Sequence, residues 1–424
     1  MPLYCERLQG WTSIADTFVS FFGNVPGAFW LDREHHATER FSVIGAGQPA
    51  SELTFTAAAD TLDVPFSFRP GYVGVVHYPE SSGELEEISM LAVDRAFVYG
   101  HDDRSMFFIG EFPDREAFDA WYHAALLRLA LIGGESSSYE LNNPAATAAE
   151  LFAEDTESQY LEKIATAQQH IAAGDVYQLC LTTRLRGEVV GDPLSYFLRL
   201  RKQHPAPFAT FVRYKAKTFV SISPELFISV SGRHVVSSPI KGTRPRSADE
   251  LEDLELMNQL GADAKERAEN LMIVDLIRND LASCCDAASV SVDSLLAVKS
   301  FSTVHQLVSD VSGELSEGKS GIDALRALLP GGSMTGAPKI RAMEIIAQLE
   351  SSSREEYSGA IGWISSSAQM ELAMVIRTAI FDEHSVSIGI GGGITSDSKP
   401  DAEHEEIRLK ALALAQVLGA KLRW

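Results

Sequence analysis

The 424-residue chain is 45% hydrophobic and 22% charged, the composition of an ordinary globular protein that can bury a large core. Its 36 basic and 58 acidic residues leave a formal charge of −22, which disfavours nucleic-acid and anionic-membrane partners. Four cysteines, two of them adjacent and none in a C-x-x-C pair, exclude a disulfide framework and a zinc site. With no basic-then-apolar leader and no apolar run of roughly 18 residues, the chain is expected to be cytoplasmic, with free thiols.

Short strand-like runs separated by turn residues dominate the first third of the chain. They lie at 28–31, 71–76 and 96–100, and no catalytic chemistry is legible among them. A polar stretch rich in glycine, serine and asparagine follows at 133–144. This stretch predicts a boundary between an N-terminal region, 1–145, and a second region, 146–424.

The second region alternates strands with long helices. A helix is expected at 156–173, ending at Gly174. Further strands are expected at 176–185, 208–212, 218–222, 226–230, 360–364, 372–380 and 386–390, and further helices near 249–282, 320–328, 337–350 and 400–421. Because several strands follow one another with short turns, we predict an α+β fold with mainly antiparallel sheets.

A lysine lies in a Pro/Gly-bounded turn directly after one predicted strand. The run from 238 to 246 reads Ser-Pro-Ile-Lys-Gly-Thr-Arg-Pro-Arg and places Lys241 near Arg244 and Arg246. Neighbouring cations and burial both lower the pKa of a lysine, and its free amine is a nucleophile. Lys241 is therefore a candidate nucleophile, although three solvated surface cations would give the same pattern.

Two helices carry carboxylates at helical spacing. Glu266 and Glu269 lie three residues apart on one face, and Glu403, Glu405 and Glu406 open the last helix. Two such helices facing one space would suit Mg²⁺, which takes one or two carboxylates and leaves its other positions to water and substrate. Either cluster alone is also typical of a solvated helix face.

Two glycine-rich segments could bind an anion through backbone N–H groups. One runs from Pro330 to Lys339 and leads into a helix, and the other runs from Gly389 to Thr395. Neither has the Walker Gly-Lys-Ser/Thr sequence or the G-x-G-x-x-G spacing, so nucleotide-binding folds are disfavoured.

The second region resembles the chorismate-utilising enzymes, which include anthranilate, aminodeoxychorismate, isochorismate and salicylate synthases. The resemblance covers roughly 150–424 and rests on motifs that occur in the family order. They are Gly-Asp-Val-Tyr-Gln at 174–178, Ser-Pro-Glu-Leu-Phe at 223–227, Pro-Ile-Lys-Gly-Thr-Arg at 239–244, the helix at 266–280, Ser-Thr-Val-His at 302–305, Gly-Ala-Pro-Lys at 336–339, Tyr-Ser-Gly-Ala-Ile-Gly at 357–362, Ile-Arg-Thr at 376–378, Gly-Gly-Gly at 391–393 and the helix at 403–410. The resemblance implies large antiparallel sheets packed as a sandwich with helices outside, as in anthranilate synthase component I.

Two positions divide the chemistries of this family. Isochorismate-type members carry a water-activating lysine where this chain has Gln178, and anthranilate synthases usually carry alanine where it has Lys241. The resemblance therefore implies amination of chorismate to 4-amino-4-deoxychorismate, on the way to p-aminobenzoate and folate. An anthranilate synthase component I and a non-catalytic member of the family remain the alternatives.

The resemblance also assigns roles to individual residues. It makes Lys241 the covalent nucleophile and Glu225 the general acid, and it assigns Mg²⁺ to Glu269 and Glu406, supported by Glu266 and Glu403. It assigns substrate binding to Gln178, Thr243, His305, Thr335, Lys339, Tyr357, Arg377, Gly391, Gly392, Gly393 and Lys410. His305 could equally be a core histidine.

Ammonia needs a source, and the chain has no Gly-x-Cys-x-Gly nucleophile elbow. The resemblance implies a separate glutamine amidotransferase subunit, which would form a heterodimer with this chain. Two departures from the family pattern stand out: Ala282-Ser283-Cys284 follows Asn279-Asp280-Leu281, and the N-terminal part is short. The run at 27–32 loosely matches a strand that lines a tryptophan pocket in some members, which leaves tryptophan binding open.

Overall fold

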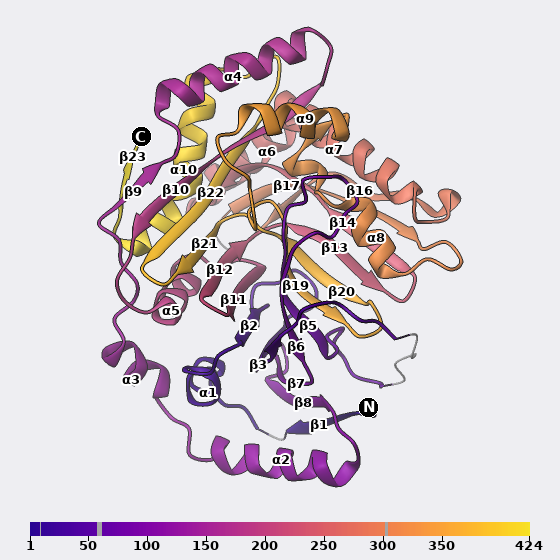
Figure 1. Ribbon diagram of the computed structural model, residues 1–424, viewed down its shortest axis with the longest axis vertical. Helices are drawn as coiled ribbons and strands as arrows, with labels where there is room; N and C mark the ends of the chain where they lie inside the picture. Colours follow the sequence, from indigo (N-terminus) through magenta and orange to yellow (C-terminus); the bar gives the residue numbers. More distant parts are fainter. Residues whose placement is uncertain (9, 57–61, 302–303) are drawn as a thin grey trace.

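Two large β-sheets form the centre of the molecule (Figure 1). The computed structural model describes residues 1–8, 10–56, 62–301 and 304–424, and within them the sheets contain 13 and 10 strands. The strands pair antiparallel, except that β23 runs parallel to β9. The predicted α+β class with mainly antiparallel sheets is confirmed.

In both sheets the order of neighbouring strands departs from their order in the chain. The larger sheet contains, from one edge to the other, β1 (Leu3–Leu8), β8 (Ser105–Glu111), β7 (Arg95–Gly100), β3 (Phe41–Ala46), β2 (Ala28–Asp32), β11 (Phe208–Tyr214), β12 (Lys217–Ser223), β21 (Thr378–Asp382), β22 (Ser385–Ile394), β10 (Gln178–Glu188), β9 (Glu150–Ala153) and β23 (Lys421–Arg423), with β18 (Gly336–Ala337) beside β10. The smaller sheet contains, in the same sense, β15 (Ile240–Pro245), β17 (Val304–Glu314), β14 (His234–Ser238), β13 (Leu226–Ser231), β20 (Met370–Met374), β19 (Ala360–Ser365), β5 (Gly71–Val76), β6 (Ile88–Val93) and β4 (Gln48–Pro49), with β16 (Ser291–Ser300) beside β17.

Helices lie on the outside of the sheets (Figure 1). They are α1 (Ile14–Phe22), α2 (Arg115–Leu129), α3 (Glu135–Asn142), α4 (Glu157–Ala172), α5 (Pro193–Gln203), α6 (Glu250–Ala262), α7 (Ala264–Ala282), α8 (Gly321–Leu328), α9 (Lys339–Leu349) and α10 (Pro400–Leu418), with short 3-10 turns at Ala287–Ser289 and Gly332–Met334. The expected helix at 156–173 is α4, and its Thr156 forms a capping box with Gln159.

Three hydrophobic clusters hold the layers together. Side chains from both sheets, including Phe29, Val73, Phe219 and Trp363, form the core between the sheets. A second cluster joins the larger sheet to its helices, and a third joins the smaller sheet to α7 and α8. Each fully buried side chain of this size contributes roughly 1.5–3 kcal/mol, so burial between layers is what fixes the sandwich.

Three expected elements differ from the observed ones. The helix expected at 249–282 is two helices, because Asp263 adopts an extended backbone and its carboxylate accepts from the N–H groups of Lys265 and Glu266. The strand expected at 372–380 is divided between β20 and β21, which lie in different sheets. The last helix ends at Leu418, where Gly419 adopts a left-handed conformation, and the chain continues into β23.

Both sheets draw strands from both parts of the sequence. In the larger sheet β2 pairs with β11, and in the smaller sheet β5 pairs with β19. The polar stretch at 133–144 contains α3, whose first turn is held by the carboxylate of Asp16. The boundary at 145/146 stays a prediction about the chain.

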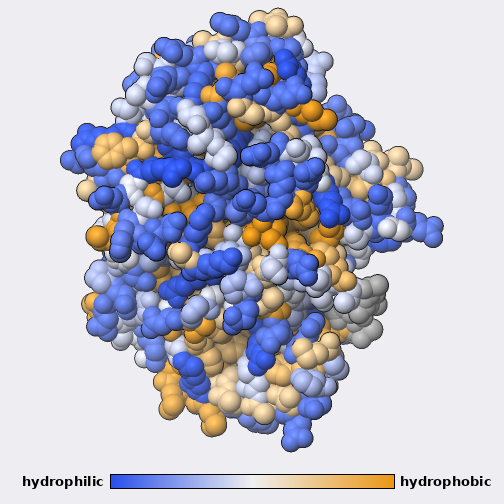
Figure 2. All heavy atoms as spheres, in the orientation of Figure 1, coloured by the Kyte–Doolittle hydropathy of each residue, from blue (hydrophilic) through white to orange (hydrophobic). Residues whose placement is uncertain are grey.

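Hydrophilic side chains cover most of the face shown in Figure 2, with hydrophobic ones in smaller patches between them. No helix in the described part of the chain is long and apolar enough to cross a membrane.

Candidate active site

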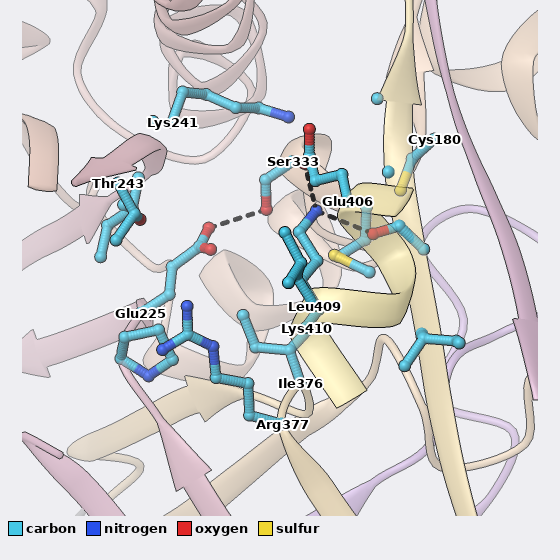
Figure 3. A pocket seen from close by; sticks show the side chains of 18 of the residues that line it. Cys180, Glu225, Lys241, Thr243, Ser333, Ile376, Arg377, Glu406, Leu409 and Lys410 are labelled. Atoms are coloured by element: carbon cyan, nitrogen blue, oxygen red, sulfur yellow. Dashed lines mark hydrogen bonds and ion pairs between the residues drawn. The ribbon is translucent and has the colours of Figure 1, made fainter. Parts of the chain in front are cut away.

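A cavity of about 370 Å³ lies where β15, β22, α7 and α10 meet. Lys241 reaches it from β15, and Glu225 reaches it from the residue that precedes β13. Arg377 enters from the connection between β20 and β21, on the opposite side of the Glu225 carboxyl from Lys241 (Figure 3). Segments more than a hundred residues apart in the sequence therefore contribute side chains to one space.

The glycines of β22 form one wall of the cavity. A Cβ placed on Gly393 would lie 3.2 Å from Glu269 Oε2 and 3.4 Å from Lys241 Nζ, and it would lie 2.7 Å from Gln178 Nε2. A side chain at Gly393 would thus enter the space where these polar groups converge. Gly391 and Gly392 line the same wall.

Lys241 points into the cavity, and its Nζ lies 3.7 Å from Glu269 Oε2. The two neighbouring arginines, which were expected to lower the pKa of Lys241, form ion pairs elsewhere. Arg244 pairs with Asp263 at 2.9 Å and Arg246 pairs with Asp253 at 2.8 Å. Burial lowers the pKa of Lys241, but the nearby carboxylates, Glu269 first, outweigh it and raise the pKa above its ordinary value. The hypothesis that neighbouring cations depress this pKa is wrong for the ligand-free protein.

Glu225 is a buried carboxyl group with the character of an acid. Its side chain accepts a hydrogen bond of 2.7 Å from the Ser333 hydroxyl. Burial raises the pKa of Glu225 to about 7, although Ser333 and Lys241 partly oppose this rise. A carboxyl group with such a pKa can hold a proton near neutral pH and donate it to a leaving group.

Glu266, Glu269, Glu403 and Glu406 all line the cavity, two from α7 and two from α10. Lysines pair with three of them: Lys265 Nζ lies 2.7 Å from Glu403 and 3.7 Å from Glu269, and Lys410 Nζ lies 2.8 Å from Glu406. These ion pairs balance much of the negative charge that the two helices bring into the cavity.

Glu266 forms no ion pair among the described residues. Burial and the charges of Glu269 and Glu406 raise its pKa. Across the described residues no three carboxylate, imidazole or thiol groups converge tightly enough to hold a metal ion as they stand. The oxygen-only donor set and the uncompensated charge at Glu266 nevertheless fit a hard divalent cation such as Mg²⁺.

Arg377 is a half-buried cation without an ion-pair partner in the described part of the chain. Its backbone has φ +48°, and this left-handed turn lets the chain leave β20 for the other sheet while the guanidinium faces the cavity. Burial lowers the pKa of Arg377, a sign that its charge is poorly compensated. Such a guanidinium offers two parallel hydrogen bonds to a substrate carboxylate.

Tyr357 and Thr243 also line the cavity, and Lys410 donates a hydrogen bond of 2.9 Å to the carbonyl oxygen of Gly391. The ring of Tyr357 lies directly against Gly389, so a side chain at that glycine would displace it. Burial raises the pKa of the Tyr357 hydroxyl, which keeps it neutral.

Four of the residues assigned to substrate binding do not line the cavity. His305 is fixed between Ser300 and Asp253 by hydrogen bonds of 2.8 and 3.0 Å, as a core histidine would be. Lys339 pairs with Asp280 at 2.7 Å. These contacts satisfy both side chains away from the cavity.

Gln178 and Thr335 complete the four residues that do not line the cavity. Gln178 is buried beside Gly393, and its Oε1 has no hydrogen-bond partner among the described residues. The Thr335 hydroxyl donates to the carbonyl oxygens of Gly331 and Gly332, so it stabilises the loop. In the Ser-Thr-Val-His motif, residues 302 and 303 lie outside the described residues.

Several residues that line the cavity were not predicted from the sequence, among them Cys180, Lys265, Gln306 and Ser333. Ser333 and Lys265 stand in or beside recognisable motifs, but nothing in the sequence places Ser333 against Glu225 or Lys265 between two helices. The four cysteines, Cys180 included, are free thiols.

A family model described as "chorismate binding enzyme" matches residues 32–416 of this chain. The chain belongs to the chorismate-binding enzyme family. The match covers all the cavity residues named above, and it extends well into the N-terminal region, beyond the resemblance seen in the sequence.

Individual members of the chorismate-binding family are similar along most of the chain. An aminodeoxychorismate synthase from Streptomyces griseus is 39% identical over 84% of this chain, which spans 51% of that relative's length. An anthranilate synthase component 1 from Streptomyces coelicolor is 34% identical over 98% of this chain and 88% of its own. The crystal structure of anthranilate synthase component I from Streptococcus pneumoniae TIGR4 superposes with a TM-score of 0.74 and 26% identity, covering 92% of this chain and 90% of that one.

Proposed function

We propose that this chain aminates chorismate to 4-amino-4-deoxychorismate, the precursor of p-aminobenzoate in folate synthesis. The observation that carries the proposal is the placement of Lys241 and Glu225 in one cavity, an amine opposite a carboxyl group with a pKa of about 7. The name aminodeoxychorismate synthase, borne by a 39% identical relative, supports the same reaction. The chain spans 51% of that relative's length, and we assign to it the part that acts on chorismate.

In the first step the Lys241 amine attacks C2 of the chorismate ring. Both ring double bonds shift, from C1=C2 and C5=C6 to C1=C6 and C4=C5, and the C4–O bond breaks. The departing hydroxyl takes the proton of Glu225 and leaves as water, so the adduct carries a secondary ammonium at C2 and Glu225 becomes a carboxylate. In the second step ammonia attacks C4, both double bonds shift back, and the C2–N bond to Lys241 breaks, which returns the neutral lysine amine. The new ammonium group at C4 then gives a proton back to Glu225. The net reaction consumes chorismate and ammonia and releases water.

Chorismate is a dicarboxylate, and the cavity offers cationic groups on two sides. Arg377 and Tyr357 would bind the enolpyruvyl carboxylate, with backbone N–H groups of Gly391–Gly393 adding donors. Glu269 and Glu406, with Glu266 and Glu403 beside them, would hold Mg²⁺. When bound, the ion supplies positive charge for the ring carboxylate and offsets the carboxylates that raise the pKa of Lys241.

Ammonia would come from a separate glutamine amidotransferase subunit that associates with this chain. The name of a relative from Escherichia coli (strain K12), aminodeoxychorismate synthase component 1, supports this arrangement, because it implies a further component; that relative is 43% identical over 59% of this chain.

Anthranilate synthesis is the second candidate, because a relative with that name matches 98% of this chain. That reaction releases pyruvate and needs no covalent lysine, so it does not explain why Lys241 lies in the cavity. A non-catalytic member of the family is the third candidate, and it would need neither Lys241 nor the raised pKa of Glu225.

A product assay separates the three candidates. The purified chain is incubated with chorismate, Mg²⁺ and an ammonium salt at about pH 8, where enough ammonia is unprotonated to react. The products are resolved by mass. We expect 4-amino-4-deoxychorismate without pyruvate. Stoichiometric pyruvate with anthranilate would support the second candidate, and unchanged chorismate would support the third.

A further inference from the structure

Ser333 and Glu225 form a buried hydrogen bond at the cavity wall (Figure 3). The Ser333 Oγ lies 2.7 Å from Glu225 Oε1, and the two residues are 8% and 5% exposed. Both line the cavity, so the bond lies next to the space for substrate. A buried hydroxyl–carboxyl bond at this position can determine where the proton of the acid resides.

The loop that carries Ser333 is held on both sides. Gly332 packs so closely that a Cβ on it would lie 2.7 Å from Leu276 Cδ2. On the other side, the carbonyl of Met334 accepts from the Arg354 guanidinium, and the Thr335 hydroxyl bonds back to Gly331 and Gly332. Ser333 is therefore a fixed donor, and the carboxyl group of Glu225 is oriented by it.

Three cations from other elements face the same carboxyl: Lys241 from β15, Lys410 from α10 and Arg377 from the β20–β21 connection. The backbone N–H of Ile240 also hydrogen-bonds to it. Burial is the main influence on the pKa of Glu225 and raises it, and the Ser333 hydrogen bond opposes that rise more than any of these charges does.

We infer that Ser333 is a positioning residue for Glu225: its hydroxyl engages Oε1, so that Oε2 carries the proton and presents it to the cavity. The inference rests on the proposed function, in which Glu225 protonates the leaving hydroxyl. Without Ser333 the carboxyl group could rotate and point its proton in more than one direction. Its pKa would also be higher, so the proton would leave less readily.

The test compares Ser333→Ala with Ser333→Thr, which retains the hydroxyl, in the assay with chorismate, ammonium and Mg²⁺. For Ser333→Ala we expect kcat to fall about tenfold while KM changes less than about twofold, since orientation of the acid affects the chemical step. We also expect the alkaline limb of the kcat/KM profile to move up by about one pH unit, because a bond that favours the ionised form is lost. In Ser333→Thr the alkaline limb of the kcat/KM profile should lie at the same pH as in the wild type.

Ser42→Ala is the matched control. Ser42 is likewise a buried serine that donates to a carboxylate, Asp32, at 3.0 Å, but it lies outside the cavity. This variant should leave the pH profile unchanged. An alkaline limb that stays in place in Ser333→Ala, or moves equally in Ser333→Thr, would overturn the inference.

A second measurement does not depend on turnover. The infrared carbonyl band of a protonated carboxylic acid, assigned to Glu225 by its loss in Glu225→Gln, is titrated in the ligand-free proteins. We expect a midpoint near pH 7 in the wild type and a higher one in Ser333→Ala. If the wild type lacks activity but the midpoint moves, the proposed function fails while the Ser333–Glu225 coupling stands; equal midpoints contradict the coupling itself.

Discussion

At the scale of single residues, the site is a set of charges that balance each other in an unusual way. Lysines and carboxylates pair around the cavity, while Arg377 forms no ion pair with any described residue and the carboxyl group of Glu225 is buried with a raised pKa. A buried charge without a partner destabilises a fold, so an unpaired guanidinium and a raised carboxyl pKa on one cavity are typical of a functional site.

The role of Lys241 is tested by its removal. Lys241→Ala is expected to lower the rate of 4-amino-4-deoxychorismate formation by roughly three orders of magnitude or more, because the covalent step disappears. Mass spectrometry of the wild type quenched with chorismate alone should show an adduct on the peptide that contains Lys241. Lys241→Arg is the control for charge, since it keeps the cation but not the nucleophile, and it should be equally inactive. Full activity in either variant would show that the amine is not the nucleophile.

Glu225 should also make stability depend on pH. Its pKa is raised from an ordinary value of 4.5 to about 7. Between these two pH values the folded state keeps a proton on Glu225 that the unfolded state has lost. The stability that this proton contributes is fully present below pH 4.5 and is lost as the pH rises through about 7. The free energy of unfolding changes by on the order of 3 kcal/mol, at about 1.4 kcal/mol per pKa unit.

Glu225→Gln removes this dependence. Urea unfolding at about pH 5 and about pH 8, on either side of the expected titration, should therefore show a smaller loss of stability in the variant than in the wild type. This should hold even though the variant is inactive. Parallel losses in the two proteins would show that Glu225 does not titrate in this range.

At the scale of elements, three local features bring the site together. The break between α6 and α7 at Asp263 starts α7 so that Glu266 and Glu269 face the cavity. The connection between β20 and β21 moves the chain from one sheet to the other and leaves Arg377 at the crossing point. The glycines of β22 keep a strand surface bare of side chains beside the lysine and the carboxylates.

The α7 start is tested by changes at Asp263. Asp263→Ala should destabilise the protein by about 1 kcal/mol in urea unfolding, because two N–H groups at the start of α7 lose their acceptor. Asp263→Asn is the matched control, since it keeps a capping oxygen while losing the ion pair with Arg244. It should lose much less stability, because a half-exposed ion pair contributes little. Equal losses in both variants would mean that the ion pair, and not the cap, holds this turn.

At the scale of the whole molecule, the two sheets join the N-terminal region to the rest. Strand β2 is hydrogen-bonded to β11, and β5 to β19, while Phe29, Val73, Phe219 and Trp363 share one core between the sheets. The cavity lies at the end of this sandwich where α7 and α10 meet β22. Its walls therefore depend on layers to which both regions contribute.

This arrangement predicts that the two regions unfold together. In native-state hydrogen exchange with increasing urea, amides of β2 and β11 should converge on one opening free energy, since the strands share hydrogen bonds and a core. Amides of the distant helix α2 provide a comparison, because α2 lies at the periphery of the N-terminal region (Figure 1). Opening of β2 at much lower free energy than β11 would show that the N-terminal region unfolds independently.

Periodicity, turn residues and local motifs were enough to determine the fold class, most helices and the family. Chain-order motifs also named Lys241, Glu225, Arg377 and the four glutamates, because each belongs to a short run with a distinctive local pattern. The helix expected at 249–282 is divided by a local cap at Asp263, whereas the other two elements that differ from the prediction have ends that depend on distant partners. Nothing local shows that 372–380 belongs to two sheets or that the chain returns after Gly419 to pair with β9.

What only the tertiary structure decided is which charged groups meet. In the sequence Arg244 and Arg246 stand next to Lys241, yet in the fold they pair with Asp263 and Asp253, and Glu269 takes their place beside the amine. His305 and Lys339 stand in motifs of the site, yet packing turns both toward other partners. A pKa and a hydrogen bond depend on distances in space, and a chain sets those distances only when its sheets and helices pack.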